Sequence, residues 1–130
     1  MNEWQPTTIL IVDDEVDMRM LVRVAIGLAN HGLTVVGEAA DGIEALSAWR
    51  ALDGPPAPDV VLLDNRMPHL SGIDAAEQIL TERPDQLIVL YSAFLDDQTR
   101  RDAAAVGIVR CLSKDDLDQL PEIIRELVAS

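Results

Sequence analysis

Short apolar runs alternate along the whole chain with longer segments in which apolar residues recur at helical spacing. An apolar run without polar alternation is typical of a parallel strand that is buried on both faces. We expect five such strands, and their ranges are Thr8–Val12, Thr34–Ala39, Val60–Leu63, Leu87–Tyr91 and Ile108–Leu112.

The segments between and after these runs predict helices, because their apolar residues recur every three to four positions. The expected ranges are 16–30, 42–50, 73–82 and 96–106, with a last helix that has Pro121 in its first turn. In the first helix we expect one face to be buried and to consist of Met18, Leu21, Val22, Ala25 and Leu28. Met20 and Val24 are then expected to face outward.

This alternation of strands and helices predicts an α/β fold, doubly wound, with a five-stranded parallel sheet and helices on both faces. The stiff segment Gly54–Pro58 is interpreted as a surface loop, since neither half of the chain holds enough strands for a sheet of its own. Residues 1–130 are therefore expected to form a single domain.

Charged residues stand at the carboxyl ends of three of the predicted strands. Asp13 and Asp14 follow the first strand, Asp64 follows the third, and Lys114 follows the fifth. Ligands of open parallel sheets bind just beyond the carboxyl ends of the strands, so we expect these side chains to meet in one cleft. Two carboxylates about 4 Å apart repel by roughly 4 kcal/mol at an effective dielectric constant of 20. The cluster therefore favours a divalent cation with oxygen ligands, most simply Mg²⁺.

The charge and composition of the chain disfavour some partners and some cellular compartments. Its net charge is −13, from 10 basic and 23 acidic residues, which disfavours direct contact with nucleic acid. The one cysteine, Cys111, excludes an internal disulfide and fits a reducing compartment. No apolar run is long enough for a membrane span, and the first residues lack a signal sequence. These observations predict a cytoplasmic protein.

Four short motifs occur in order, each at the end of an expected strand. They are Ile11–Glu15, Asp64–Pro68 with Gly72 beyond it, Tyr91–Ala93 and Ser113–Lys114. Together they resemble the receiver domain of two-component response regulators, the CheY-like family, over nearly the whole chain. The resemblance implies a flavodoxin-like (βα)5 fold with strand order 2-1-3-4-5.

The resemblance also implies roles for individual residues. Asp64 would accept a phosphoryl group from a sensor histidine kinase or a histidine phosphotransfer protein, forming an aspartyl phosphate. Mg²⁺ would be held by Asp13, Asp14 and Asp64, together with the backbone carbonyl of Arg66. Ser92 would bind a phosphoryl oxygen, and Lys114 would pair with the phosphoryl group or, in its absence, with Asp64.

Two positions depart from the family pattern. Cys111 stands where the family has a switch aromatic, and Asp115 follows Lys114 where proline is common. We expect the face made by the fourth helix, the fifth strand and the fifth helix to report phosphorylation. Without the switch aromatic, either this face responds through backbone shifts or its response is weak. Asp after this lysine also occurs in some regulators that carry a helix-turn-helix output domain.

The sequence thus predicts a phosphorylatable signalling switch that transforms no metabolite and assists only its own phosphorylation and dephosphorylation. One alternative is the receiver half of a helix-turn-helix transcriptional regulator. Another is a Mg²⁺-dependent phosphatase with an aspartate nucleophile. Arg66 disfavours the phosphatase, because such enzymes need an acid at that position. The output protein and homodimerisation are left open.

Overall fold

The computed structural model describes residues 6–29, 32–52 and 57–129. Most of the loop expected at Gly54–Pro58, namely residues 54–56, lies outside the described residues. Residue 30, the last of the expected first helix, also lies outside them.

Five parallel strands form one sheet in the order β2-β1-β3-β4-β5, which confirms the predicted fold class and topology. The strands are β1 (Thr7–Val12), β2 (Leu33–Ala39), β3 (Val60–Asp64), β4 (Leu87–Ser92) and β5 (Arg110–Ser113).

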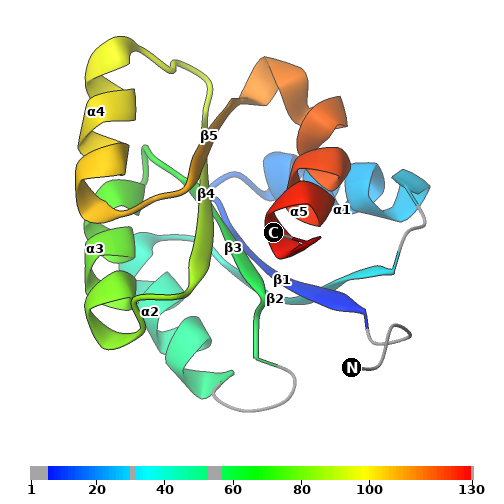
Figure 1. Cartoon of the computed structure of the whole chain (residues 1–130), viewed down its shortest axis with the longest axis horizontal. Helices are drawn as coiled ribbons and strands as arrows, with labels where there is room; N and C mark the ends of the chain where they lie inside the picture. Colours follow the sequence, from blue (N-terminus) through cyan, green and yellow to red (C-terminus); the bar gives the residue numbers. More distant parts are fainter. Residues whose placement is uncertain (1–5, 30–31, 53–56, 130) are drawn as a thin grey trace.

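The helices lie on both sides of this sheet. They are α1 (Val16–Ala29), α2 (Gly42–Ala51), α3 (Gly72–Glu82), α4 (Asp97–Val106) and α5 (Leu120–Ala129), with a short 3₁₀ helix, η1 (Lys114–Gln119), between β5 and α5. Helices α1 and α5 cover one face of the sheet, and α2, α3 and α4 cover the other (Figure 1). Among the described residues, no helix combines the length and low polarity that crossing a bilayer requires.

The start of several helices is set by a polar residue that caps it. The side chains of Asp41, Ser71 and Asp96 each accept a hydrogen bond from the backbone N–H three residues further on. Such a cap satisfies an N–H group that has no partner within the helix, and it contributes about 1 kcal/mol.

The core has two layers, one on each face of the sheet. In β1, Leu10 and Val12 pack toward α2 and α3, whereas Ile9 and Ile11 pack toward α1 and α5. All four side chains are fully buried. The continuous apolar runs are thus explained by burial of both faces, as expected for a parallel sheet.

The buried face of α1 differs from the expected one. Val22 and Ile26 are buried, whereas Leu21 and Leu28 are exposed. Apolar residues occur on nearly every side of this helix, so periodicity did not identify the side that faces the sheet. Met20 and Val24 are exposed, as expected.

The fifth strand begins two residues later than expected, at Arg110. Gly107 ends α4 with φ of 100°, and the N–H of Ile108 donates to the carbonyl of Ala103. This hydrogen bond belongs to the helix end, where a glycine with positive φ is common, and it keeps Ile108 out of the sheet.

The close approach of α3 to the end of β3 depends on Gly72. A Cβ atom at this position would lie 2.3 Å from the carbonyl oxygen of Asp64, so Gly72→Ala must shift either α3 or the Asp64 backbone. We expect a loss of stability of about 1–3 kcal/mol in urea unfolding. Gly27→Ala in α1 is the matched control, because a Cβ there meets no atom within 4 Å. Equal stability of the two variants would contradict this account.

Candidate functional site

The sheet register brings the expected site residues to one edge. Val12 lies beside Leu63, Asp64 beside Tyr91, and Ser92 beside Ser113. Because the strands are parallel and end at nearly the same level, the residues that follow them converge at their carboxyl ends.

A pocket opens at this edge, and its walls come from four different loops. It is lined by Asp14, Glu15, Asp64, Arg66, Ser92, Ala93 and Lys114. Asp13 does not line the pocket and is fully buried, whereas Asp14 is exposed. The two neighbouring aspartates therefore have different surroundings.

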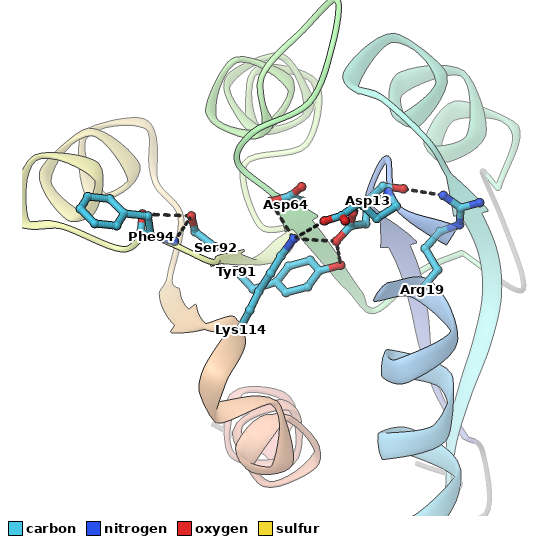
Figure 2. A network of polar contacts seen from close by, with 8 residues as sticks. Asp13, Arg19, Asp64, Tyr91, Ser92, Phe94 and Lys114 are labelled. Carbon is cyan, nitrogen blue, oxygen red and sulfur yellow. Dashed lines mark hydrogen bonds and ion pairs between the residues drawn. The ribbon is translucent and has the colours of Figure 1, made fainter. Parts of the chain in front are cut away.

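Lys114 reaches from the end of β5 to the two buried carboxylates. Its Nζ lies 3.0 Å from Oδ2 of Asp13 and 3.4 Å from Oδ1 of Asp64. Figure 2 shows the ammonium group between these two side chains. The expected pairing of Lys114 with Asp64 is therefore present, but the shorter contact is with Asp13.

Asp13 is held by donors from three segments. Its Oδ2 accepts hydrogen bonds from Lys114 and from the hydroxyl of Tyr91, and its Oδ1 accepts one of 2.8 Å from the N–H of Glu15. Nη1 of Arg19 donates to its backbone carbonyl at 2.6 Å. A buried carboxylate is tolerated only when it is hydrogen-bonded or paired in this way.

The electrostatics of the site follow from burial and from like charges. Burial, and then the charge of Asp13, raise the pKa of Asp64 to about 6, although Lys114 opposes this shift. Burial lowers the pKa of Lys114, but hydrogen bonding to Asp13 and the charge of Asp64 outweigh it, so the pKa is raised overall. Burial and the contact with Asp13 raise the pKa of Tyr91. At neutral pH the lysine is thus charged and the phenol remains a donor.

Three carboxylates could share a cation here. One oxygen each of Asp13, Asp14 and Asp64 lies within 4.8 Å of the others. Only one ammonium group, that of Lys114, lies among them in the part of the chain that the structure describes. An oxygen donor set that is short of positive charge fits a hard divalent ion such as Mg²⁺.

Ser92 lies at the pocket, but its hydroxyl is bound to its own loop. The Oγ donates to the carbonyl of Phe94 at 3.1 Å and accepts from the N–H of Phe94 at 3.2 Å. In Figure 2 it is joined to Phe94 and not to Asp64 or Lys114. The guanidinium of Arg66 lies 5.9 Å from the centre of the Phe94 ring, so these two side chains flank the pocket together.

The two departures from the family pattern have simple local structures. Cys111 is half-buried and packs against the core on the side of α2, α3 and α4. Lys114 is the first residue of η1, and the N–H of Asp115 donates to Oγ of Ser113, which caps that helix.

Sequence reasoning missed Tyr91 as a member of the site and treated it only as part of a motif. A signal was available, because Tyr91 is the only aromatic residue in β4 and the only tyrosine of the chain. A buried tyrosine hydroxyl needs a hydrogen-bond partner, and the nearest polar groups were those expected at the strand ends. That the Tyr91 hydroxyl donates to Asp13 could be recognised only once the register of β3 and β4 was known.

Comparison with known proteins identifies the family. The model of the response regulator receiver domain matches residues 9–125. This chain belongs to that family and is a receiver domain of two-component systems.

Individual relatives agree with this assignment. The protein-glutamate methylesterase/protein-glutamine glutaminase 1 of Caulobacter vibrioides is 37% identical over 125 residues, which cover 93% of this chain and 34% of that protein. The transcriptional regulatory protein YxjL of Bacillus subtilis is 35% identical over 118 residues, covering 90% of this chain and 52% of YxjL. The solved signal receiver domain of NarL from Mycobacterium tuberculosis superposes with a TM-score of 0.86 at 28% identity, and covers 97% of this chain and 98% of that domain.

The chain spans about a third of the methylesterase relative and about half of the transcriptional regulator. The likeness therefore concerns the receiver part that these proteins share, and it assigns no methylesterase activity to this chain.

The raised pKa of Asp64 has a consequence for stability. Because the folded state binds a proton more tightly than the unfolded state, this group favours folding below its ordinary pKa of 3.8, and the benefit is lost as pH rises through about 6. Without divalent ions at pH 7.5, Asp64→Asn should therefore be more stable than the wild type, by about 1–3 kcal/mol.

This gain should shrink toward zero as pH falls to 4, where Asp64 is protonated and resembles asparagine. Urea unfolding of both proteins between pH 4 and 8 tests this, and other titrating groups cancel in the difference. A stability gain that is independent of pH would show that the gain of Asp64→Asn is not caused by removing the ionisation of Asp64.

Proposed function

We propose that Asp64 is the phosphoacceptor of this receiver domain and that the phosphorylated form is the signalling state. The observation that carries the proposal is the meeting of Asp64, Asp14 and Lys114 in one pocket at the carboxyl edge of the sheet. Asp64 and Glu15 both line the pocket and lie within 4.0 Å of the ammonium of Lys114, but Asp64 is buried and is the nearer of the two, at 3.4 Å against 3.9 Å.

In the proposed reaction, a carboxylate oxygen of Asp64 attacks the phosphorus of a phosphohistidine on a partner protein. The new P–O bond forms as the P–N bond breaks, and the histidine imidazole leaves with the bonding electron pair and takes up a proton. The product is a mixed anhydride, as in other enzymes that use an aspartate nucleophile. Lys114 is placed to balance the charge that the phosphoryl oxygens bring to the pocket.

Mg²⁺ is the proposed cofactor, and the residues that would hold it are Asp13, Asp14, Asp64 and the backbone carbonyl of Arg66. When bound, a divalent ion neutralises charge on the phosphoryl oxygens. Asp14 is the acid best exposed to receive it, since Asp13 is fully buried and already accepts three hydrogen bonds through its carboxylate.

Ser92 is the proposed sensor of the phosphoryl group. Its hydroxyl is 3.1–3.2 Å from two main-chain atoms of Phe94, and it would have to leave them to bind a phosphoryl oxygen. Such a turn would release the loop that leads into α4. We therefore propose α4, β5 and α5 as the reporting face, with the backbone of this loop as the connection, since Cys111 offers no aromatic ring to move.

The proposed donor is a sensor histidine kinase or a histidine phosphotransfer protein in the reducing cytoplasm. We propose that residues 1–130 act as one receiver unit, with an output protein that the site does not specify. The receiver half of a transcriptional regulator is a second candidate, because Asp115 follows Lys114 and the relatives include YxjL. Turnover of small phosphate esters by the chain would instead favour an aspartate-nucleophile phosphatase.

The phosphoacceptor is tested with acetyl phosphate and Mg²⁺, followed by intact-mass measurement. We expect the wild type to gain one acid-labile phosphoryl group and Asp64→Asn to gain none, because an amide is not a nucleophile for phosphorus. Asp85→Asn is the control, since Asp85 is exposed and lies just before β4, at the opposite edge of the sheet. Full labelling of Asp64→Asn on another residue would refute the assignment.

The metal role is tested by titrating Mg²⁺ into the unphosphorylated protein in a calorimeter. Asp14→Ala should weaken binding by about 10–100-fold or more, because it removes the exposed acid of the cluster. Asp17→Ala is the control, since Asp17 is also exposed near the start of α1 but is not part of the cluster. Equal Mg²⁺ affinity of the two variants would contradict the proposed metal site.

A further inference from the structure

Tyr91 contacts both Asp13 and Lys114 although it does not line the pocket. It lies at the second-last position of β4, and its side chain is fully buried. Its hydroxyl donates to Oδ2 of Asp13, and Nζ of Lys114 lies 5.0 Å from the centre of its ring. The other residues of the strand before it, Leu87–Leu90, are aliphatic.

These contacts determine how Asp13 uses its two oxygens. An ionised carboxylate offers about two acceptor positions on each oxygen. On Oδ2 of Asp13, both are occupied, one by the hydroxyl of Tyr91 and one by Lys114 at 3.0 Å. Oδ1 accepts the N–H of Glu15 and keeps one position for another ligand. The hydroxyl thus fixes which oxygen of Asp13 is directed at the lysine and which keeps an acceptor position for another ligand.

The same contacts determine the position of the ammonium group. Lys114 is attracted by Oδ2 of Asp13, by Oδ1 of Asp64 and by the electron-rich face of the Tyr91 ring. A fourth and longer contact, of 3.9 Å, joins it to the exposed carboxylate of Glu15. A lysine side chain has four rotatable bonds, so without such guidance it would sample many positions. Tyr91 supplies one of these four attractions, and its hydroxyl holds Asp13, which makes the shortest contact with the lysine.

We propose that Tyr91 is a positioning residue of the receiver site, whose hydroxyl fixes the Asp13 carboxylate and which thereby holds Lys114 over Asp64. The inference rests on the proposed function, since it concerns the phosphorylation of Asp64. Tyr91 touches no reacting atom in this assignment and acts only through Asp13 and Lys114.

The activity test compares the wild type, Tyr91→Phe and Val89→Ala with acetyl phosphate at saturating Mg²⁺. Tyr91→Phe keeps the ring and removes only the hydroxyl. We expect its maximal phosphorylation rate to fall about tenfold, because the ammonium is no longer held in place, while the acetyl phosphate concentration for half-maximal rate changes less than twofold. Mg²⁺ should bind at least as tightly as to the wild type, since the lost donor had drawn charge from Asp13.

Val89→Ala is the control for disturbance of β4. Val89 is fully buried on the same face of the strand, two residues before Tyr91, and it packs in the same core cluster. This variant should be destabilised in urea, with a maximal rate per folded molecule within twofold of the wild type. A rate for Tyr91→Phe within twofold of the wild type would overturn the proposal, as would an equal loss in Val89→Ala.

A second test needs no phosphorylation and uses the fact that the chain has only one tyrosine. Incorporation of 3-fluorotyrosine places one fluorine atom at position 91, which gives a single ¹⁹F NMR signal. We expect the signal to move on saturation with Mg²⁺ and in Asp13→Asn and Lys114→Met, but not in Asp85→Asn. A ¹⁹F signal whose chemical shift is unchanged by Mg²⁺, by Asp13→Asn and by Lys114→Met would overturn the proposal.

These measurements distinguish a failure of the proposed function from a failure of the role of Tyr91. If the wild type takes no phosphoryl group, or if Asp64→Asn is labelled as fully as the wild type, the proposed function fails. If the wild type is labelled on Asp64 and Tyr91→Phe matches it in rate, the role of Tyr91 alone is wrong.

Discussion

The structure of the site depends on one ammonium group placed between two buried carboxylates. Asp13 is fully buried, Asp64 is 4% exposed, and Lys114 lies 3.0 and 3.4 Å from them. One positive charge cannot neutralise both acids and the neighbouring Asp14, so the site remains short of positive charge, and Asp64 has a raised pKa. The fold maintains this arrangement at a cost in stability, which is a common property of functional sites.

The parallel sheet is what holds these charged side chains so close together. Burial of β1, β3 and β4 on both faces anchors the strands, and their ends carry the charged residues on short loops. Gly72 brings the start of α3 against the Asp64 backbone, and the N–H of Gly72 donates to the carbonyl of Asn65. The loop after β3 is therefore fixed by packing and hydrogen bonds, so repulsion among the carboxylates is not relieved by moving Asp64 away.

The features that could be predicted from sequence are those that repeat or that lie at element ends. Apolar runs located the five strands, and the polar residues after them located Asp13, Asp14, Asp64 and Lys114. The buried face of α1 could not be predicted, because Leu21 and Leu28 are as apolar as Val22 and Ile26, and only packing distinguishes them. The contrast between Asp13 and Asp14, and the contact of Asp13 with Tyr91, depend on side-chain directions that spacing does not contain.

The separation between the site and the outer faces explains how one receiver design accompanies different outputs. The charged groups contact one another at the carboxyl edge of the sheet, whereas Arg101 of α4 and Glu122 of α5 are exposed and pair with neighbours on their own helices. Relatives with methylesterase and transcriptional names accordingly share this domain with the chain. The chemistry of the edge constrains few residues, and the loop that follows Ser92 leads from that edge into α4.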